Sequence, residues 1–329
     1  MQSGAALRGR MTKSPPTPAL PAARPAAPRS AVGVRRFLRQ HGTALTLLAP
    51  FLLLFAVFTL WPVLRSLYLS FTDYDAISDP KVVGLQNYQT LLGDPRFRKA
   101  LANTAVYMLG TSLCSTVLGL MLALVFGGQR LFDQIMRACF FLPSVAGGVG
   151  LISVFKWLFS SEDFGLINSI RLWLHLDAVR FLGMPKYAVP VLIVLAVWGL
   201  MGYNMIMFVA GLRSIPHDIY EAAAIDGATP AQRFWRITLP LLRPVLLFVL
   251  VTSMIGAFQE FFSFYFLFSD TSNVGGILDS GLSLVVYLYD LGFRHLQMGM
   301  ASALAWILFI MLFLLTALNL KLGRINDID

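Results

Sequence analysis

The most specific pattern in the chain is Ser214–Pro240, which reads SIPHDIYEAAAIDGATPAQRFWRITLP. Its first serine can cap a helix that has Pro216 in the first turn, where a missing N–H does no harm. Gly227 stands where a left-handed C-terminal cap is expected. Thr229, followed by Gln232, predicts a capping box at the start of a second helix. The stretch therefore predicts a helix, a glycine turn and a second helix that together form a rigid projection.

Long stretches without charge lie on both sides of this projection. A helix needs roughly 20 apolar residues to cross the hydrocarbon layer of a membrane. Pro240 and Pro244 separate the second short helix from the span that follows it. An apolar run at Gly281–Tyr289 is too short to cross and is expected to form a surface helix or strand. Six spans are predicted: Gly42–Leu64, Ala100–Gln129, Ala138–Phe155 continuing to Phe159, Tyr187–Leu212, Pro244–Ser269 and Leu296–Leu320.

The composition supports a membrane protein. Hydrophobic residues make up 57% of the 329 residues and charged residues only 13%, whereas soluble domains carry about 25% charged residues. This composition excludes an ordinary water-soluble enzyme, and it also excludes a disordered chain. The predicted fold class is an all-α membrane protein with six transmembrane helices.

The net charge of +9 reflects membrane orientation and not nucleic-acid binding. With the N-terminus in the cytosol, the inner segments are 1–41, 127–137, 213–243 and 321–329. These segments hold 16 basic and 6 acidic residues, while the outer segments and span ends hold 10 of each. An excess of Lys and Arg on the cytosolic side is typical of membrane proteins. Both termini are therefore predicted to be cytosolic.

Three parts are expected along the chain. Residues 1–42 are rich in Pro, Ala and Arg and are predicted to be a disordered cytosolic tail. Residues 43–322 form the six-helix domain, with the loop 213–243 on its cytosolic side. Residues 323–329 form a cytosolic C-terminal tail.

The sequence contains no recognisable catalytic or metal-binding pattern. Cys114 and Cys139 lie in apolar runs and cannot supply a disulfide framework or a zinc site by themselves. No HExxH, GxSxG or phosphate-binding P-loop pattern occurs. The chain is therefore expected to be no enzyme and to hold no cofactor of its own. An ion-coupled secondary transporter that works without an ATPase is the alternative function, although such proteins more often carry several intramembrane charges.

Glu260 is the clearest charge at depth in a predicted span. An ionised group there costs at least about 2.5 kcal/mol, so it should face a partner or an aqueous cavity. On one continuous helix, Ser253, Gly256, Glu260 and Ser263 would share a face. These four residues and Gln259 are the candidate solute pathway. The alternative, a structural hydrogen bond to a neighbouring helix, fits the sequence equally well.

The projection resembles the EAA loop of permease subunits in binding-protein-dependent ABC importers. The family pattern is Glu-Ala-Ala, three residues, Gly, nine residues, Ile, one residue and Leu-Pro. Its fixed positions are filled here by Glu221, Ala222, Ala223, Gly227, Ile237, Leu239 and Pro240. Five further stretches are similar to sugar permeases of the maltose/glycerol-phosphate type: Gly84–Tyr88, Asn103-Thr104, Gly165–Asn168, Ala257–Phe261 and Tyr289–Phe293.

This resemblance implies a type I ABC importer transmembrane domain in the bacterial inner membrane. It also implies several partners: a second homologous permease subunit, a dimer of ATPase subunits that binds ATP and Mg, and an external solute-binding protein that delivers a sugar. The absence of an arginine in the middle of any span favours a neutral sugar.

The resemblance further implies roles for the loop residues. The first helix would dock in a cleft of the ATPase, with Glu221 as its polar anchor and Gly227 as the turn. Residues 237–240 would link the loop to the fifth span. ATP binding would draw two such helices together and open the pathway outward, and hydrolysis would reset it.

Overall fold

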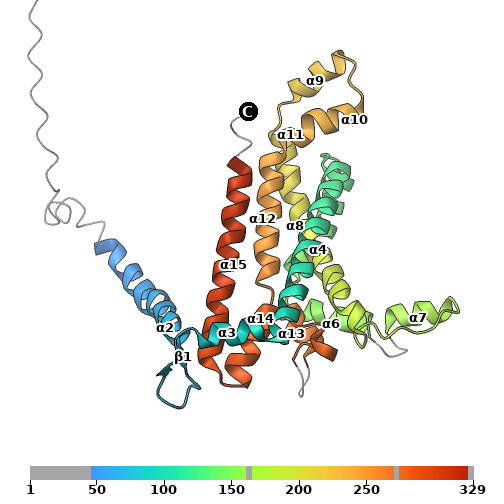
Figure 1. Ribbon diagram of the computed structural model, residues 1–329. Coiled ribbons are helices and arrows are strands. Elements are labelled where there is room, and N and C mark those ends of the chain that lie inside the picture. Colours follow the sequence, from blue (N-terminus) through green and yellow to red (C-terminus); the bar gives the residue numbers. More distant parts are fainter. Residues whose placement is uncertain (1–45, 161–164, 270–273, 325–329) are drawn as a thin grey trace, which may run out of the picture. The chain divides into compact units, whose positions relative to one another are not determined.

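The computed structural model describes residues 46–160, 165–269 and 274–324 (Figure 1). The predicted N-terminal tail, 1–42, lies outside the described residues, as do residues 325–329 of the predicted C-terminal tail. The chain divides into two compact units, 1–60 and 61–329. In the first unit, residues 46–60 are helical and end in a π-helical turn, η1 (Ala56–Leu60), and all of them are exposed.

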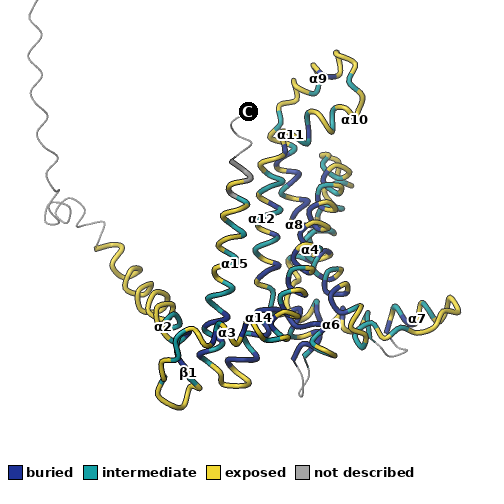
Figure 2. The backbone as a smooth tube through the Cα atoms, in the orientation of Figure 1, coloured by how far each residue is buried: buried dark blue, intermediate teal, exposed yellow. Residues whose placement is uncertain are grey.

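The second unit is built around long helices. It contains α2 (Trp61–Leu69), α4 (Pro95–Phe126), α8 (Pro185–Ser214), α12 (Arg243–Phe258) and α15 (Met298–Arg324). Helix α4 packs along α8 and against α12, and α15 packs against α2 and α12. Buried residues follow the inner faces of α4, α8, α12 and α15, while the outer faces of these helices are exposed (Figure 2). An apolar, exposed outer face is what a helix in contact with lipid presents.

Four of the predicted spans are continuous helices. Among the described residues, helices of sufficient length and hydropathy are Thr46–Leu69, Pro95–Phe126, Pro185–Ser214 and Met298–Asn319. Two further helix pairs pass the same criteria only if each bent pair is counted as one span. The total is therefore four spans, or six with the bent pairs, and the prediction of an all-α membrane fold is confirmed.

The third predicted span is sharply bent. It consists of α5 (Leu131–Val145) and α6 (Val149–Leu158), which meet at 100°. Pro143 lies in the last turn of α5, and Gly148 adopts φ +89°, a conformation that favours glycine. The predicted span over Ala138–Phe155 is therefore one span only if α5 and α6 are counted together, because this proline and glycine end the first helix inside it.

The fifth predicted span, Pro244–Ser269, is also broken. Helix α12 ends at Phe258, and a separate short helix, α13 (Phe262–Phe268), follows. The Glu260 carboxylate accepts the backbone N–H of Ser263 over 2.8 Å and so satisfies a donor at the start of α13. The prediction of one continuous helix across Glu260 is wrong, because this side chain supports the start of a new helix.

Short elements gather at the end of the bundle opposite to α9 (Figure 1). They include the antiparallel strands β1 (Thr72–Asp73) and β2 (Lys81–Val82), and the helices α3 (Gln86–Gly93), α6 and α7 (Leu166–Trp173). The segment before α15 adds η3 (Ile277–Asp279), α14 (Leu284–Tyr289) and η4 (Asp290–Arg294). Leu284 and Val286 of α14 are fully buried, so the apolar run predicted at the surface is a helix inside the core.

Close backbone packing holds the helices together. A Cβ atom on Gly202 of α8 would lie 1.9 Å from the carbonyl oxygen of Phe140 in α5, so only glycine allows this approach. Tyr107, Phe208 and Phe264 are fully buried between the helices. Because lipid is as apolar as these side chains, such packing contacts take over much of the role that the hydrophobic effect has in water.

Candidate functional site

Helix α9 (His217–Ile225) and helix α10 (Pro230–Arg233) form a projection beyond the ends of α8 and α12 (Figure 1). The predicted serine cap is wrong. Ser214 is the last residue of α8, and its hydroxyl donates back to the Gly211 carbonyl over 2.7 Å. Pro216 occupies the cap position of α9 and has no side chain that can accept a hydrogen bond.

The predicted turn and second cap are both confirmed. Gly227 adopts φ +75°, and the next N–H, of Ala228, bonds the Ala223 carbonyl over 2.9 Å. Thr229 and Gln232 form the capping box, with distances of 3.3 Å and 2.8 Å between side chain and backbone. Both ends of the turn are therefore fixed by local hydrogen bonds.

The solvent-facing surface of α9 combines a carboxylate with apolar side chains. Glu221 is largely exposed, and its Oε1 atom lies 3.0 Å from Nδ1 of His217, one turn earlier. Ile225 is 87% exposed, whereas Ala223 is buried. Of the other candidate coupling residues, Ala222 and Pro240 are exposed, and Ile237 and Leu239 are half-buried in η2 (Phe234–Thr238) and α11 (Leu239–Leu241).

Four of the five candidate pathway residues line one cavity despite the break in span five. The cavity has a volume of about 270 Å³ and lies between α4, α5, α6, α8, α12 and α13. Ser253, Gly256, Glu260 and Ser263 belong to its lining, but Gln259 is exposed and lies elsewhere. The described lining contains one carboxylate, several hydroxyl groups and no Lys, Arg or His. This chemistry suits a neutral polyhydroxylated solute better than an anion.

Asn204 forms a buried polar contact beside this cavity, and this contact was not predicted from the sequence. Its Nδ2 atom donates to Ser115 of α4 over 3.2 Å and to Ser253 of α12 over 3.4 Å. Asn204 is only 1% exposed, so α4, α8 and α12 meet at a buried hydrogen-bonded centre. Its position in a uniformly apolar run gave the only available signal, because an amide there needs partners.

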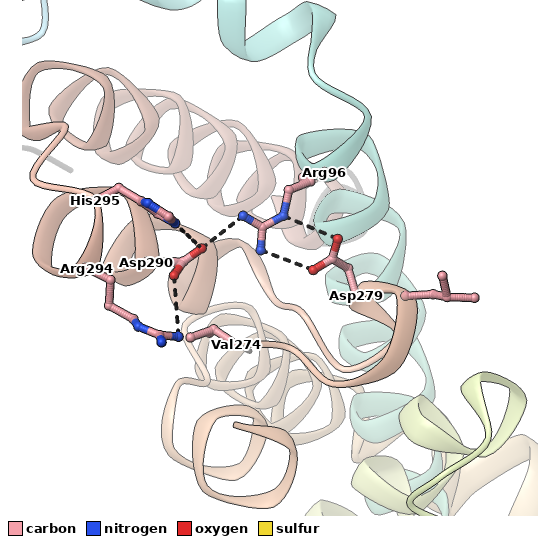
Figure 3. Close-up of a pocket in the computed structure, with 7 residues that line it drawn as sticks. Arg96, Val274, Asp279, Asp290, Arg294 and His295 are labelled. Atoms are coloured by element: carbon pink, nitrogen blue, oxygen red, sulfur yellow. Dashed lines mark hydrogen bonds and ion pairs between the residues drawn. The ribbon is translucent and has the colours of Figure 1, made fainter. Parts of the chain in front are cut away.

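A cluster of charged side chains lies between the start of α4 and the short elements η3 and η4 (Figure 3). The guanidinium of Arg96 contacts Asp279 through two nitrogens, over 3.1 Å and 3.3 Å, and Asp290 through a third, over 3.0 Å. His295 and Arg294 approach Asp290 at 3.6 Å and 3.9 Å. The side chain of Asp290 is only 4% exposed. We name these five residues the charged cluster, which lines a second cavity of about 500 Å³.

The charged cluster joins α4 to the segment that precedes α15. Asp94, which caps α4, also accepts a hydrogen bond from the Tyr287 hydroxyl of α14. Burial, with the hydrogen bond to Asp94 and its charge, raises the pKa of the Tyr287 hydroxyl above its ordinary value. In the sequence, Asp290 stands out only as part of the run Tyr289–Phe293, and no pattern marks Arg96.

Several polar side chains near the short elements serve as backbone anchors. Asn87 donates to the carbonyls of Ser70 and Thr72, which fixes α3 against β1. Asn103 donates to the carbonyls of Asp279 and Leu282, over 2.9 Å and 3.0 Å. Further anchors of the same kind are Thr104, which accepts from Leu284, and Asn168, which bonds Ser160 and Val179. These anchors hold irregular segments in place around the helix ends.

Comparison with known proteins identifies the fold and the family. The model of the "binding-protein-dependent transport system inner membrane component" family matches residues 115–326. The arabinooligosaccharides transport system permease protein AraP of Bacillus subtilis (strain 168) is 35% identical over 276 residues, with 84% of this chain and 86% of that protein covered. The lactose transport system permease protein LacF of Rhizobium radiobacter is 34% identical over 281 residues, with 84% and 92% covered.

A solved structure shows the same architecture. One chain in the crystal structure of a bacterial alginate ABC transporter, in complex with an alginate pentasaccharide-bound periplasmic protein, aligns with a TM-score of 0.76. The alignment covers 88% of this chain and 97% of that chain, at 22% identity. This protein therefore has the fold of a type I ABC importer transmembrane domain. It belongs to the binding-protein-dependent transport system inner membrane component family, whose members are permease subunits.

Proposed function

We propose that this chain is the transmembrane permease subunit of an ATP-driven importer that moves a neutral sugar across the bacterial inner membrane by alternating access. The observation that carries the proposal is the ordered projection of α9, Gly227 and α10, which presents Glu221 and Ile225 on an exposed surface. The related permeases named for arabinooligosaccharides and lactose support a sugar as the solute. An external solute-binding protein delivers this sugar, as the family name indicates.

The energy comes from a separate ATPase. The sequence has no P-loop pattern that would hold ATP and Mg. A dimer of ATPase subunits binds both and receives α9 in a cleft, where Ile225 supplies apolar contact and Glu221 a charge. A second, homologous permease completes the pathway. The coupling residues are Glu221, Ala222, Ala223, Gly227, Ile237, Leu239 and Pro240.

The projection faces the cytosol. The segment 213–243 and the other inner segments carry most of the basic residues, and cytosolic loops are enriched in Lys and Arg. Both termini lie on this side, and the charged cluster faces outward.

In a cysteine-free background, an impermeant thiol reagent should label Ser78→Cys in intact cells and leave Ser214→Cys unlabelled, and the reverse pattern would contradict this orientation.

The proposal is tested by purifying the complex through a tag on this chain. We expect an ATPase subunit and a second permease to co-purify, and the complex to hydrolyse ATP in a vanadate-sensitive manner. Reconstituted with its solute-binding protein, the complex should take up labelled lactose or arabino-oligosaccharides only when ATP is present. Sugar uptake that depends on an ion gradient and not on ATP would favour a secondary transporter instead.

The pathway residues are tested at Glu260. This carboxylate lines the cavity of about 270 Å³ and bonds the Ser263 N–H, which an amide oxygen can also accept. We expect Glu260→Gln to preserve assembly and basal ATP hydrolysis but to lower sugar uptake per complex by about tenfold, because a charge-assisted hydrogen bond is about twice as strong as a neutral one. Gln259→Leu, at the exposed neighbour, is the matched control. Wild-type uptake per complex in Glu260→Gln would exclude a pathway role.

A further inference from the structure

A hydrogen bond connects α9 to the chain segment that leads into span five. The hydroxyl of Tyr220, next to the candidate anchor Glu221, lies 3.0 Å from Oγ1 of Thr238. Thr238 ends the π-helical turn η2 and is 6% exposed. The two residues are separated by the whole turn at Gly227 and by α10. The contact therefore closes the projection into a loop fixed at both ends.

The direction of this hydrogen bond follows from a second contact. The Thr238 hydroxyl donates to the Arg233 carbonyl over 3.3 Å. Because threonine has a single hydroxyl proton, Tyr220 is the donor and Oγ1 of Thr238 the acceptor. The chain of hydrogen bonds runs from α9 through Thr238 to the carbonyl that precedes the π-helical turn. Short π-helical turns inside longer helices are frequent at functional sites.

Few other contacts hold α9 in place. Ala223 is its only buried residue, and among the described elements α9 has no extensive packing against another helix. By contrast, η2 packs against α10 and α11, and α11 packs against α12. Besides its backbone connection to α8, α9 is linked to α12 along the backbone through the Gly227 turn and through the hydrogen bond between Tyr220 and Thr238.

We propose that Tyr220 and Thr238 are positioning residues that transmit the movement of α9 to span five. The inference rests on the proposed coupling function of α9 and adds the contact through which the movement of α9 reaches span five. With the contact in place, α9, η2 and the start of α12 move as one body. Without it, α9 pivots about the Gly227 turn and part of its movement is lost before it reaches the cavity.

The test removes single hydroxyl groups. Tyr220→Phe and Thr238→Val keep the size of each side chain and delete the hydrogen bond. Measured in the co-purified complex with labelled lactose and arabino-oligosaccharides as probes, each variant should transport about three- to tenfold less sugar per ATP hydrolysed. This range corresponds to the net contribution of one hydrogen bond. Basal ATP hydrolysis and the melting temperature of the complex should stay at wild-type values.

Further variants and a second measurement make the test specific. The double variant should be no worse than either single variant, because both remove the same contact. Thr238→Ser keeps the hydroxyl and should restore coupling, and Tyr68→Phe, at an exposed tyrosine of α2, is the control for losing a tyrosine hydroxyl. Amide hydrogen exchange over residues 217–226 should be faster in Tyr220→Phe, whatever sugar the complex carries.

The outcomes separate this inference from the function on which it rests. Wild-type coupling in both single variants, additive losses in the double variant, or equal losses in Thr238→Ser and Thr238→Val would each overturn the positioning role. A wild-type complex that shows no ATP-dependent uptake would overturn the proposed function itself. In that case faster exchange in Tyr220→Phe would still establish the contact, and unchanged exchange would exclude it.

Discussion

A complex that carries Gly227→Val in this chain is expected to lose about tenfold in binding-protein-stimulated ATP hydrolysis and in sugar uptake. Gly227 adopts φ +75°, which costs an ordinary residue about 1–2 kcal/mol and a β-branched residue more. A Cβ atom at this position would meet nothing within 4 Å. The expected loss therefore comes from the backbone alone, as α9 is forced out of its angle to α10. Hydrolysis and uptake are measured per assembled complex.

Two controls isolate the backbone effect. Asparagine tolerates the left-handed conformation, so Gly227→Asn should retain most of the activity. Gly93→Val introduces the same side chain at another glycine with open surroundings and an ordinary φ, so it should behave as the wild type. Equal losses in Gly227→Asn and Gly227→Val would point to a contact made by the glycine surface itself. Full activity in Gly227→Val would exclude the turn from coupling.

Local signals in the projection were predictable because their partners lie within a few residues. The Thr229 cap needs only Gln232, and the Gly227 turn needs only the carbonyls of α9. The predicted Ser214 cap failed for a reason that local patterns do not contain. Helix α8 continues past its apolar run to Ser214, so the Ser214 hydroxyl bonds a carbonyl of α8 in place of an N–H of α9.

The bends in the spans were harder to predict than the spans themselves. Length and hydropathy predict that a segment crosses the membrane, but they do not predict where the helix bends. The 100° angle between α5 and α6 is a bend that neither property predicts. Glu260 was interpreted through a continuous helix, although a carboxylate can instead cap a new one, as it does toward Ser263. Four of the five candidate pathway residues still line one cavity because α13 starts directly after the break.

The charged cluster lay beyond any sequence pattern in a single chain. Arg96 meets Asp279 and Asp290, which are 183 and 194 positions away along the sequence. The spacing of these residues does not predict a contact, and each of them taken separately resembles an ordinary charged residue in a loop. The pairing appears only when α4 and the segment before α15 are brought together. Asn103, which bonds the carbonyls of Asp279 and Leu282, shows the same long-range dependence.

Arg96→Leu is expected to cause the largest loss of stability among single substitutions at the charged cluster. The change leaves the Asp290 carboxylate, 4% exposed, with only Arg294 at 3.9 Å and His295 at 3.6 Å. Removing one partner of a buried ion pair costs about 3–5 kcal/mol. A third of the Arg96 side chain is in contact with solvent, so we expect about 2–4 kcal/mol here, since exposure weakens such pairs. The melting temperature of the purified complex measures the loss.

The matched control is Arg98→Leu, which removes an exposed arginine from the same turn of α4 and should change stability by less than about 0.5 kcal/mol. Arg96→Lys keeps the charge but cannot contact both aspartates with three nitrogens, so it should recover only part of the loss. Asp279→Asn should cost less than Arg96→Leu, because Asp279 is more exposed than Asp290 and its carbonyl is still held by Asn103. A stability in Arg96→Leu equal to that of Arg98→Leu would show that the ordering of the segment before α15 comes from its backbone anchors, Asn103 and Thr104, and not from its charges.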